Sequence, residues 1–321
     1  MRSDSSWIVV GLDNGGTNNN ATIMDASRRF LVDRLVESPS RVLEGPGPAV
    51  WALAHAFDSV LKFSGVARAS VRAVGLGSPG PANADGVLSS KGSTNFSQPE
   101  WRGFDFRGAL ESRLNLPVTY INDANAAALY AHHERFGEAA SRHSSVSVVV
   151  GTGLGGGVIE CGRVVRGAAG MAGELGHVQL QLQGLLEEGQ PLPICNCGVT
   201  GDAESIASLT GIEKNLLPYW LTRYPEHPLN QVADAGEAAK LVRGYGERGD
   251  EMALKIFEQQ AIAIGRLLTI AANFTDPHVY LLGGGVVEAA PHFRDWFLDR
   301  VRHHTVLREE QQRASSIALV P

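Results

Sequence analysis

Cysteine is scarce in this chain: there are three among 321 residues, and two of them stand together in Cys195-Asn196-Cys197. So few cysteines exclude the disulfide framework of a small secreted domain. Long apolar runs are also missing, since no segment approaches the roughly 20 residues that a membrane-spanning helix needs. The opening residues, Met1-Arg2-Ser3-Asp4, lack the apolar stretch and the cleavage site of a signal peptide. We therefore expect a cytoplasmic protein with no membrane partner.

An excess of positive charge is also lacking. The net charge is −6 and the isoelectric point is near 5.9, which argues against a nucleic-acid-binding surface. With 44% hydrophobic and 19% charged residues, the chain has the composition of a globular protein. Its length suits about two domains with a large core.

One stretch combines a strand, a carboxylate and a helix. The β-type run Val118–Ile121 ends in the polar pair Asn122-Asp123, and an alanine-rich helical stretch follows to Gly137. A carboxylate at the carboxyl end of a strand in an α/β sheet is well placed to meet a ligand. The alternative is that Asp123 only caps the helix, accepting hydrogen bonds from the amides of its first turn.

Near its start the chain has a glycine turn between strands. Trp7–Asp13 is expected as a buried strand, Asn14 to Thr17 as a turn, and Asn18–Asp25 and Phe30–Glu37 as two further strands. No helix follows the glycines, so this is neither a Rossmann unit nor a P-loop. A tight Gly15-Gly16 turn lets backbone N–H groups approach an anion, and an aspartate before it can hold hydrated Mg²⁺. An ordinary β-hairpin is the alternative.

The same arrangement returns in the second half. The strand Ser145–Val150 leads into Gly151–Gly157, and the strands Val158–Cys161 and Arg163–Arg166 follow. The run contains GxGxxG, but a dinucleotide site needs a helix after its glycines, and here a strand follows. Two strand–glycine–strand hairpins therefore head two α/β halves, as expected for a duplicated fold with a nucleotide between the halves.

The other segments are assigned from periodicity and turn residues. Helices are expected at 48–63, 105–114, 204–220, 236–245, 250–274 and 287–304, strands at 71–76, 279–282 and 317–320, and a polar loop at 89–101. We expect Trp101 to pack in the core rather than to stack on a ligand. His132 and His133, and likewise His303 and His304, are expected on solvated helix faces.

Several motifs stand in a fixed order along the chain. They are Asp13-Asn14-Gly15-Gly16-Thr17, Asn122-Asp123, GTGLGGG at 151–157, GELGH at 173–177, CNCGVTGDAE at 195–204 and LLGGG at 281–285. Together they resemble the ROK family, which comprises sugar kinases and related repressors in the actin-like, hexokinase-type ATPase superfamily. The resemblance implies a two-lobed, RNase H-like α/β fold with an active-site cleft between the lobes. The small lobe would be residues 1–121, and the large lobe, with a zinc-motif insertion, residues 122–321.

The resemblance also implies roles for single residues. Asp123 would be the catalytic base that takes the proton of the sugar hydroxyl. The sugar would be bound by Asn95, Asn122, Glu174, His177 and Glu204. ATP with Mg²⁺ would be held by Asp13, Gly15, Gly16, Thr17, Gly151, Thr152, Gly153 and Gly155, with Gly283 and Gly284 beside the adenosine. A structural zinc ion would be bound by His177, Cys195, Cys197 and Asp202.

The chemistry suits these residues, because phosphoryl transfer has a loose transition state and needs positioning more than a strong base. We expect the helix dipole to hold the pKa of Asp123 low, which is adequate for this role. The chain departs from the family at Asp202, where a third cysteine is usual, and in a long interval between His177 and Cys195. A carboxylate can complete the zinc site in place of a thiolate; otherwise the site is vestigial and the thiols are free.

The sequence therefore predicts an ATP-dependent sugar kinase, with the 6-OH of glucose as the favoured acceptor, acting as a homo-oligomer such as a dimer. One alternative is a kinase for N-acetylmannosamine or N-acetylglucosamine, and another is a sugar-sensing regulator without catalysis. Because the first strand begins near Trp7, we expect no winged helix-turn-helix ahead of it and no nucleic-acid partner. Relatives of this kind continue past the last strand into a helix, whereas this sequence stops at Pro321.

Overall fold

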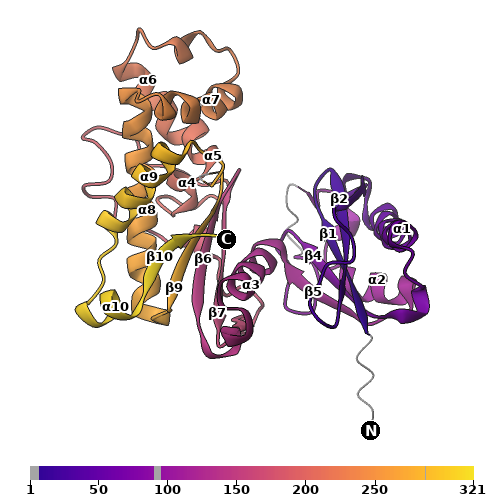
Figure 1. The fold of residues 1–321 in the computed structure, drawn as a ribbon. Helices are drawn as coiled ribbons and strands as arrows, with labels where there is room; N and C mark the ends of the chain where they lie inside the picture. Colours follow the sequence, from indigo (N-terminus) through magenta and orange to yellow (C-terminus); the bar gives the residue numbers. More distant parts are fainter. Residues whose placement is uncertain (1–6, 90–94, 286) are drawn as a thin grey trace. The chain divides into compact units, whose positions relative to one another are not determined.

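The computed structural model describes residues 7–89, 95–285 and 287–321. The chain divides into two compact units, Met1–Ala126 with Arg166–Ala172, and Ala127–Val165 with Gly173–Pro321. Each unit is built on a five-stranded mixed sheet with helices packed against it (Figure 1), which confirms the expected α/β class. Within the described ranges, no helix has both the length and the apolar character of a membrane span.

The first sheet has the order β3-β2-β1-β4-β5. Its strands are β1 Ile8–Asn14, β2 Asn18–Asp25, β3 Val36–Pro39, β4 Val71–Ser78 and β5 Val118–Asn122. β1 and β2 form an antiparallel hairpin, while β4 and β5 run parallel to β1, so Asn14, Ser78 and Asn122 end at one edge. The carboxyl ends of these strands therefore bring the first glycine turn and Asp123 to the same edge of the sheet.

The expected strand Phe30–Glu37 is wrong in its extent. Phe30 makes an isolated bridge to Met24, and the regular strand β3 begins only at Val36. Leu31 and Leu35 between them remain exposed, so burial does not hold this segment along the sheet.

Helices α1 Pro46–Ser64 and α2 Phe106–Leu114 lie side by side on one face of the first sheet (Figure 1). Leu53 and Phe57 of α1 are fully buried with Val10 and Leu12 of β1. Trp101 is also fully buried in this core, and its indole Nε1 donates a hydrogen bond to the carbonyl of Val42 at 3.0 Å. Its predicted packing role is confirmed. The loop expected at 89–101 lies partly outside the described residues, at 90–94.

The second sheet has the order β10-β9-β6-β7-β8. Its strands are β6 Ser145–Val150, β7 Leu154–Glu160, β8 Arg163–Val164, β9 Val279–Gly284 and β10 Ser316–Leu319. The second glycine turn is shorter than expected, because Gly155, Gly156 and Gly157 already lie in β7. A Cβ on Gly156 would stand 2.8 Å from the side chain of Leu175, so glycine here lets that leucine pack against the strand.

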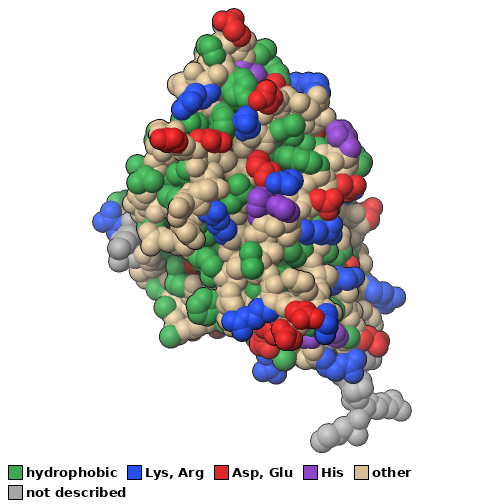
Figure 2. All heavy atoms as spheres, turned by 90° about the vertical axis from the view of Figure 1, so that its left-hand side faces the viewer, with side chains coloured by type: hydrophobic (Ala, Val, Ile, Leu, Met, Phe, Trp, Pro, Cys, Tyr) green, Lys and Arg blue, Asp and Glu red, His purple; other side chains and the backbone are tan. Residues whose placement is uncertain are grey.

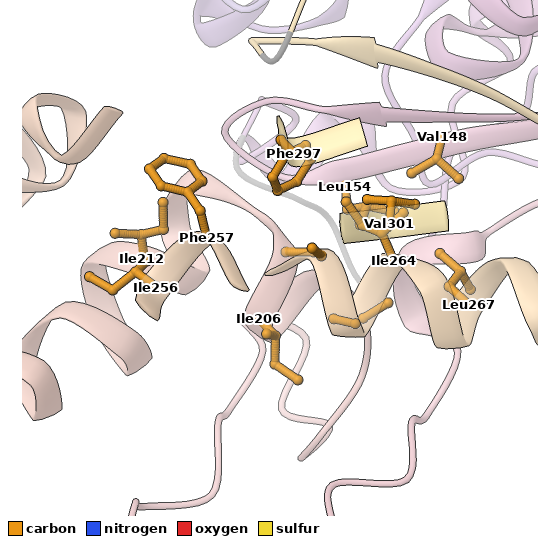
Figure 3. Close-up of a cluster of buried hydrophobic side chains, with 14 of the residues drawn as sticks. Val148, Leu154, Ile206, Ile212, Ile256, Phe257, Ile264, Leu267, Phe297 and Val301 are labelled. Atoms are coloured by element: carbon orange, nitrogen blue, oxygen red, sulfur yellow. The ribbon is translucent and has the colours of Figure 1, made fainter. Parts of the chain in front are cut away.

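Helices cover both faces of the second sheet. On one face, Ala131 and Phe136 of α3 Asp123–Phe136 pack against Val279 and Leu281 of β9. On the other face, the alternate residues Tyr280 and Leu282 belong to the large core with α8 Glu251–Thr275 and α9 Pro291–His304. Figure 3 shows side chains of this core from α8 and α9 beside Val148 of β6.

The helix expected at 204–220 is broken into short pieces. They are α4 Glu204–Ala207, α5 Leu209–Gly211, a π-helical turn Ile212–Leu216 and α6 Leu217–Arg223. The break lies at Ser208, whose extended backbone starts a new helix and whose Oγ accepts a hydrogen bond from the N–H of Gly211 at 2.9 Å. Helices α7 Ala235–Glu247 and α10 Glu309–Ala314 complete the unit, and α10 was not expected.

The expected solvent exposure of His132 is wrong. Its side chain is fully buried, with Nδ1 at 2.8 Å from Oγ of Ser145 and Nε2 at 2.9 Å from the carbonyl oxygen of Ala140. Burial lowers the pKa of this imidazole. His304 is likewise engaged, since its Nε2 lies 2.7 Å from Oε1 of Glu258.

Figure 2 shows the side of the molecule that carries helices of the second unit, with acidic and basic side chains interspersed over it. Neighbouring residues on one helix form ion pairs, such as Lys240 with Glu237 at 2.7 Å and Arg302 with Asp299 at 3.0 Å. Such exposed pairs contribute little to stability. Their mixed signs agree with the modest net charge of the chain.

Candidate active site

The first glycine turn joins β1 to β2. The N–H of Gly15 donates to the carbonyl of Asn18 at 2.9 Å and closes the turn. Ser40 supports it from one side, because its N–H donates to the carbonyl of Thr17 and its Oγ to that of Gly16. Asp13 is exposed at the end of β1, where its Oδ2 accepts from Nδ2 of Asn20 at 3.2 Å. The first set of expected phosphate and Mg²⁺ residues therefore lies together on one hairpin.

Asn95, an expected sugar ligand, lies against this hairpin. A Cβ added to Gly16 would stand only 2.7 Å from Oδ1 of Asn95. Real Cβ atoms essentially never come so close to another heavy atom, so glycine at 16 makes room for the amide. A side chain at position 16 would therefore have to displace the amide of Asn95.

The helix-capping role expected as the alternative for Asp123 belongs to its neighbour. Oδ1 of Asn122 accepts hydrogen bonds from the N–H groups of Ala124 at 3.0 Å and Asn125 at 3.2 Å. Asp123 is the first residue of α3, its Oδ1 accepts from Ala124 at 2.8 Å, and its side chain is exposed. The start of the helix is thus satisfied by an amide, and a carboxylate is held at the strand end.

The pKa of Asp123 is raised, so the expectation of a low pKa is wrong. Although the side chain reaches the surface, the protein around it replaces part of its hydration, which disfavours the charged carboxylate. The N–H of Ala124 opposes this rise, and the negative charge of Asp13 adds to it. A more basic carboxylate is a better proton acceptor, provided that it is still ionised at the working pH.

The second glycine turn joins β6 to β7. The N–H of Gly151 donates to the carbonyl of Gly153 at 2.9 Å. The carbonyl of Gly151 accepts from the N–H of Leu209, and that of Thr152 accepts from both the N–H and the Oγ1 of Thr210. Gly151, Thr152 and Gly153 therefore form the turn, with two carbonyls bonded to the α5 segment, and Gly155 follows in β7.

A cavity of about 290 Å³ opens beside this turn within the second unit. Its apolar wall includes Phe257, Phe293 and Phe297. Its polar groups come from Thr152, Lys240, Arg243 and Gln260. Gly283 and Gly284 are the last two residues of β9, and the next residue, Gly285, lines the cavity; its carbonyl accepts from Nη1 of Arg243 at 2.9 Å. An aromatic wall with cations nearby suits a purine nucleotide.

Sequence reasoning did not identify Lys240 and Arg243. The two cations stand three positions apart on α7, so that they share a face of the helix. That spacing is visible in the sequence. Exposed basic helix faces are common, however, so the spacing alone does not indicate a binding site, and the cavity is needed to identify one.

The four expected metal ligands lie together. Their ligand atoms, from His177, Cys195, Cys197 and Asp202, are all within 4.8 Å of one another. Nδ1 of His177 is 3.1 Å from Oδ2 of Asp202, 3.6 Å from Sγ of Cys197 and 4.0 Å from Sγ of Cys195. The Cys197 sulfur lies 3.7 Å from Oδ2 of Asp202.

These distances fit one zinc ion. Tetrahedral bonds of roughly 2.0–2.3 Å give ligand–ligand separations of about 3.3–3.8 Å, close to those of the cluster. The buried Asp202 uses its two oxygens differently: Oδ2 faces the cluster, and Oδ1 accepts from the N–H of Ser205 at 2.9 Å at the start of α4. Burial raises the pKa of the Cys195 thiol above its usual range, whereas a bound zinc ion deprotonates its thiol ligands.

The expected sugar ligands of the second unit border this cluster. Glu174 and His177 are exposed around the short 3-10 turn Leu175–His177. Glu204 opens α4, where its Oε2 accepts from the N–H of Leu154 at 2.9 Å and its Oε1 from the Cys195 thiol at 3.3 Å. The contact between Glu204 and the second glycine hairpin was not anticipated from the sequence.

Comparison with known proteins places these motifs in one family. The family model described as the ROK family matches residues 9–316. A glucokinase of Halalkalibacterium halodurans is 31% identical over 298 residues, which covers 92% of this chain and 84% of that protein. An N-acetyl-D-glucosamine kinase of Erwinia tasmaniensis is 32% identical over 287 residues, covering 87% of this chain and 84% of that protein.

Solved structures give the same result. A ROK hexokinase from Thermus thermophilus shares 32% sequence identity with a TM-score of 0.74, covering 97% of this chain and 92% of that one. A ROK family glucokinase from Streptomyces griseus, in complex with glucose and AMPPNP, shares 26% identity with a TM-score of 0.67, covering 98% and 93%.

Proposed function

The chain belongs to the ROK family, and on that premise we propose that it is an ATP-dependent kinase that transfers the γ-phosphoryl group to a hexose hydroxyl. Asp123 is the observation that carries this proposal. It is an exposed carboxylate at a strand end, relieved of the capping role by Asn122, with its pKa raised. These are the properties that a general base for a sugar hydroxyl needs.

Asp123 accepts the proton of the attacking sugar hydroxyl. The hydroxyl oxygen bonds to the γ-phosphorus at the same time, and ADP leaves. Little proton transfer is needed early, because the transition state is loose and most charge stays on the phosphoryl oxygens. The N–H groups of Gly15 and Gly151 are used within their own turns, so other backbone N–H groups of the two turns would approach the phosphate oxygens. Mg²⁺, bound with ATP near Asp13, would neutralise phosphate charge.

ATP is the proposed donor. The cavity beside the second glycine turn has the aromatic wall and polar groups to take the adenosine, and Gly283 and Gly284 directly precede its lining residue Gly285. The related Streptomyces griseus glucokinase was crystallised with the ATP analogue AMPPNP, which supports this choice.

A structural zinc ion is proposed at His177, Cys195, Cys197 and Asp202. The short distances between their ligand atoms support it. Zinc there would be a closed structural site and would take no part in phosphoryl transfer. It would fix the imidazole of His177 and the start of α4, and so place Glu174, His177 and Glu204 for the sugar.

We favour the 6-OH of glucose as the acceptor, with Asn95 and Asn122 among the sugar ligands. The glucokinase from Halalkalibacterium halodurans supports glucose, whereas the kinase from Erwinia tasmaniensis supports N-acetylglucosamine as the second candidate. Asp123 and both glycine turns disfavour a sugar sensor without catalysis. We place the enzyme in the cytoplasm as a homo-oligomer such as a dimer, with no nucleic-acid partner.

The test is coupled ADP release with ATP and a panel of glucose, mannose, fructose, allose and the N-acetylhexosamines. We expect the highest kcat/KM with glucose. A higher value with an N-acetylhexosamine would move the assignment to the second candidate. No turnover with any sugar, together with tight sugar binding, would favour the sensor.

A further inference from the structure

Glu204 contacts two parts of the second unit that the proposed function keeps separate. Its Oε1 lies 3.3 Å from Sγ of Cys195 in the metal cluster, and its Oε2 accepts a hydrogen bond from the N–H of Leu154 at 2.9 Å in the second glycine hairpin. Leu154 and Glu204 are 50 positions apart in the sequence. A single carboxylate thus connects the metal-ligating residues to the hairpin proposed to bind phosphate.

The chain segment after Glu204 strengthens this connection. The N–H of Leu209 donates to the carbonyl of Gly151, and the N–H and Oγ1 of Thr210 donate to that of Thr152. Asp202 belongs to the cluster through Oδ2 and to α4 through the bond from Ser205 to Oδ1. Residues 202–210 therefore connect the cluster directly to the carbonyl groups of Gly151 and Thr152 in the hairpin.

The hairpin, Glu204 and the 3-10 turn of the cluster are closely packed. A Cβ on Gly153 would stand 2.6 Å from Oε2 of Glu204. A Cβ on Gly176, next to His177, would clash with the carbonyl of Leu154 and lie 3.4 Å from Cβ of Glu204. Gly176 thus lets the hairpin backbone and the 3-10 turn of the cluster approach one another, and Gly153 leaves room for the Glu204 carboxylate. A displacement of the 3-10 turn toward the hairpin would be opposed by this close packing.

We propose that Glu204 is a positioning residue that couples metal binding at the cluster to nucleotide binding at the Gly151–Gly157 hairpin. This inference rests on the proposed function, because it needs both the metal and the nucleotide. Metal fixes Cys195 and Asp202, these fix the start of α4, and Glu204 then holds the Leu154 N–H in place. The hairpin is therefore already ordered when the nucleotide binds, and less of the binding free energy is spent on ordering it.

The experiment measures binding of Mg·AMPPNP without sugar by isothermal titration calorimetry. Zinc-loaded protein is compared with protein treated with a chelator, and with chelated protein to which zinc is restored. For the wild type we expect metal removal to weaken nucleotide binding about tenfold, within the usual range of coupling between sites, and zinc to restore it. Circular dichroism at the titration temperature checks that both forms are folded.

Two variants separate the route through Glu204 from general loosening. Glu204→Ala removes the carboxylate, so nucleotide binding should be weak and should keep only the smaller metal dependence that the backbone bonds of Leu209 and Thr210 carry. Thr210→Val removes another support of the same hairpin that does not touch the cluster. This control should bind nucleotide less tightly in both metal states and keep the tenfold dependence. An equal metal dependence in Glu204→Ala and wild type overturns the inference.

Thermodynamic linkage between zinc and nucleotide binding provides a second measurement that does not depend on enzyme activity. If metal tightens nucleotide binding tenfold, AMPPNP must raise the zinc affinity by the same factor. Competition against a chromogenic chelator, with and without Mg·AMPPNP, measures this directly in the wild type and in Glu204→Ala. Zinc and nucleotide that bind without affecting each other refute the coupling and leave the proposed function intact. Wild-type protein that binds nucleotide but no zinc refutes the zinc site and the coupling and leaves the kinase assignment intact. Wild-type protein that binds no nucleotide refutes the function and the coupling together.

Discussion

Oδ2 of the buried Asp202 lies 3.1 Å from Nδ1 of His177, so the carboxylate and the imidazole of the cluster are in direct contact. The other oxygen of the same carboxylate accepts a hydrogen bond from the N–H of Ser205, in the first turn of α4. A thiolate has one ligand atom and could not serve both partners. At this position the chain thus combines a candidate metal ligand and an acceptor for a helical N–H in one side chain.

This double role predicts different results for two substitutions. Asp202→Asn keeps an oxygen for the Ser205 N–H but loses the charged ligand. It should therefore lower zinc content from near one per chain while the free energy of unfolding in chelator stays unchanged. Asp202→Ala should lose the zinc and also about 1 kcal/mol of unfolding free energy, the usual net value of one hydrogen bond. Elemental analysis and urea unfolding measure the two effects. Full zinc content in Asp202→Asn would show that the carboxylate is not a ligand.

Asp123→Asn tests the catalytic base. We expect kcat to fall by at least ~10²-fold, as is typical when a general base is lost, with sugar binding retained. The fold should be unaffected, because an asparagine oxygen can still accept from Ala124. Asn122→Ala is the matched control for the cap: it should lower the unfolding free energy by about 1 kcal/mol. Near-normal turnover in Asp123→Asn would remove Asp123 from the mechanism.

The raised pKa of Asp123 predicts the acidic limb of the pH profile. Reduced hydration is the main cause, and the charge of Asp13 adds to it. The base works only when ionised, so kcat/KM for the sugar should fall as the pH drops through a pKa above the ordinary aspartate range. Asp13→Asn removes the like charge and should shift this limb to lower pH, whatever it does to the maximal rate. A limb at the same pH in both proteins would contradict this electrostatic link.

The fold class, the turn positions and the strand ends could be predicted from the sequence, because they follow from local patterns. The buried strand Val279 to Leu282, the glycine turn at 15–16 and the position of the turn that begins at Gly151, though not its length, are of this kind. The capping role of Asn122 could not be separated from Asp123, since adjacent polar residues suit the same turn. The burial of His132 and the contact of Glu204 with Leu154 depend on distant segments meeting, which no local pattern contains. The pKa of Asp123 likewise depends on its surroundings in space.

Two glycines of the second hairpin should respond differently to alanine. A Cβ on Gly151 meets nothing within 4 Å, whereas one on Gly156 would stand 2.6 Å from the carbonyl of Ser147 and 2.8 Å from Leu175. Gly151→Ala should therefore keep the melting temperature and raise KM for ATP, because the methyl group hinders close approach of phosphate. Gly156→Ala should instead lower the melting temperature. Unchanged KM for ATP in Gly151→Ala would count against a phosphate-binding turn.

His132 should make stability depend on pH. Its pKa is lowered in the folded protein by burial, whereas in the unfolded chain it is near the ordinary value of about 6.5. The unfolded state then binds the extra proton, so the contribution to stability is full above pH ~6.5 and is lost as the pH falls toward the folded pKa. His132→Gln should flatten this part of the curve of unfolding free energy between pH 7 and pH 5. Identical slopes for both proteins would exclude His132 as the source.

The first unit is not continuous in the chain, since Arg166–Ala172 belongs to it although Ala127–Val165 lies in the second unit. Within this segment Gly170 packs so closely on Asn83 and Ala84 that a Cβ would clash with their backbone. During synthesis the first unit therefore cannot be complete until residue 172 has left the ribosome, when part of the second unit has already emerged. The usual order, in which an N-terminal domain is complete before synthesis of the next one begins, therefore does not hold for this unit. A cut between the units at a single peptide bond would likewise leave each fragment with an incomplete fold.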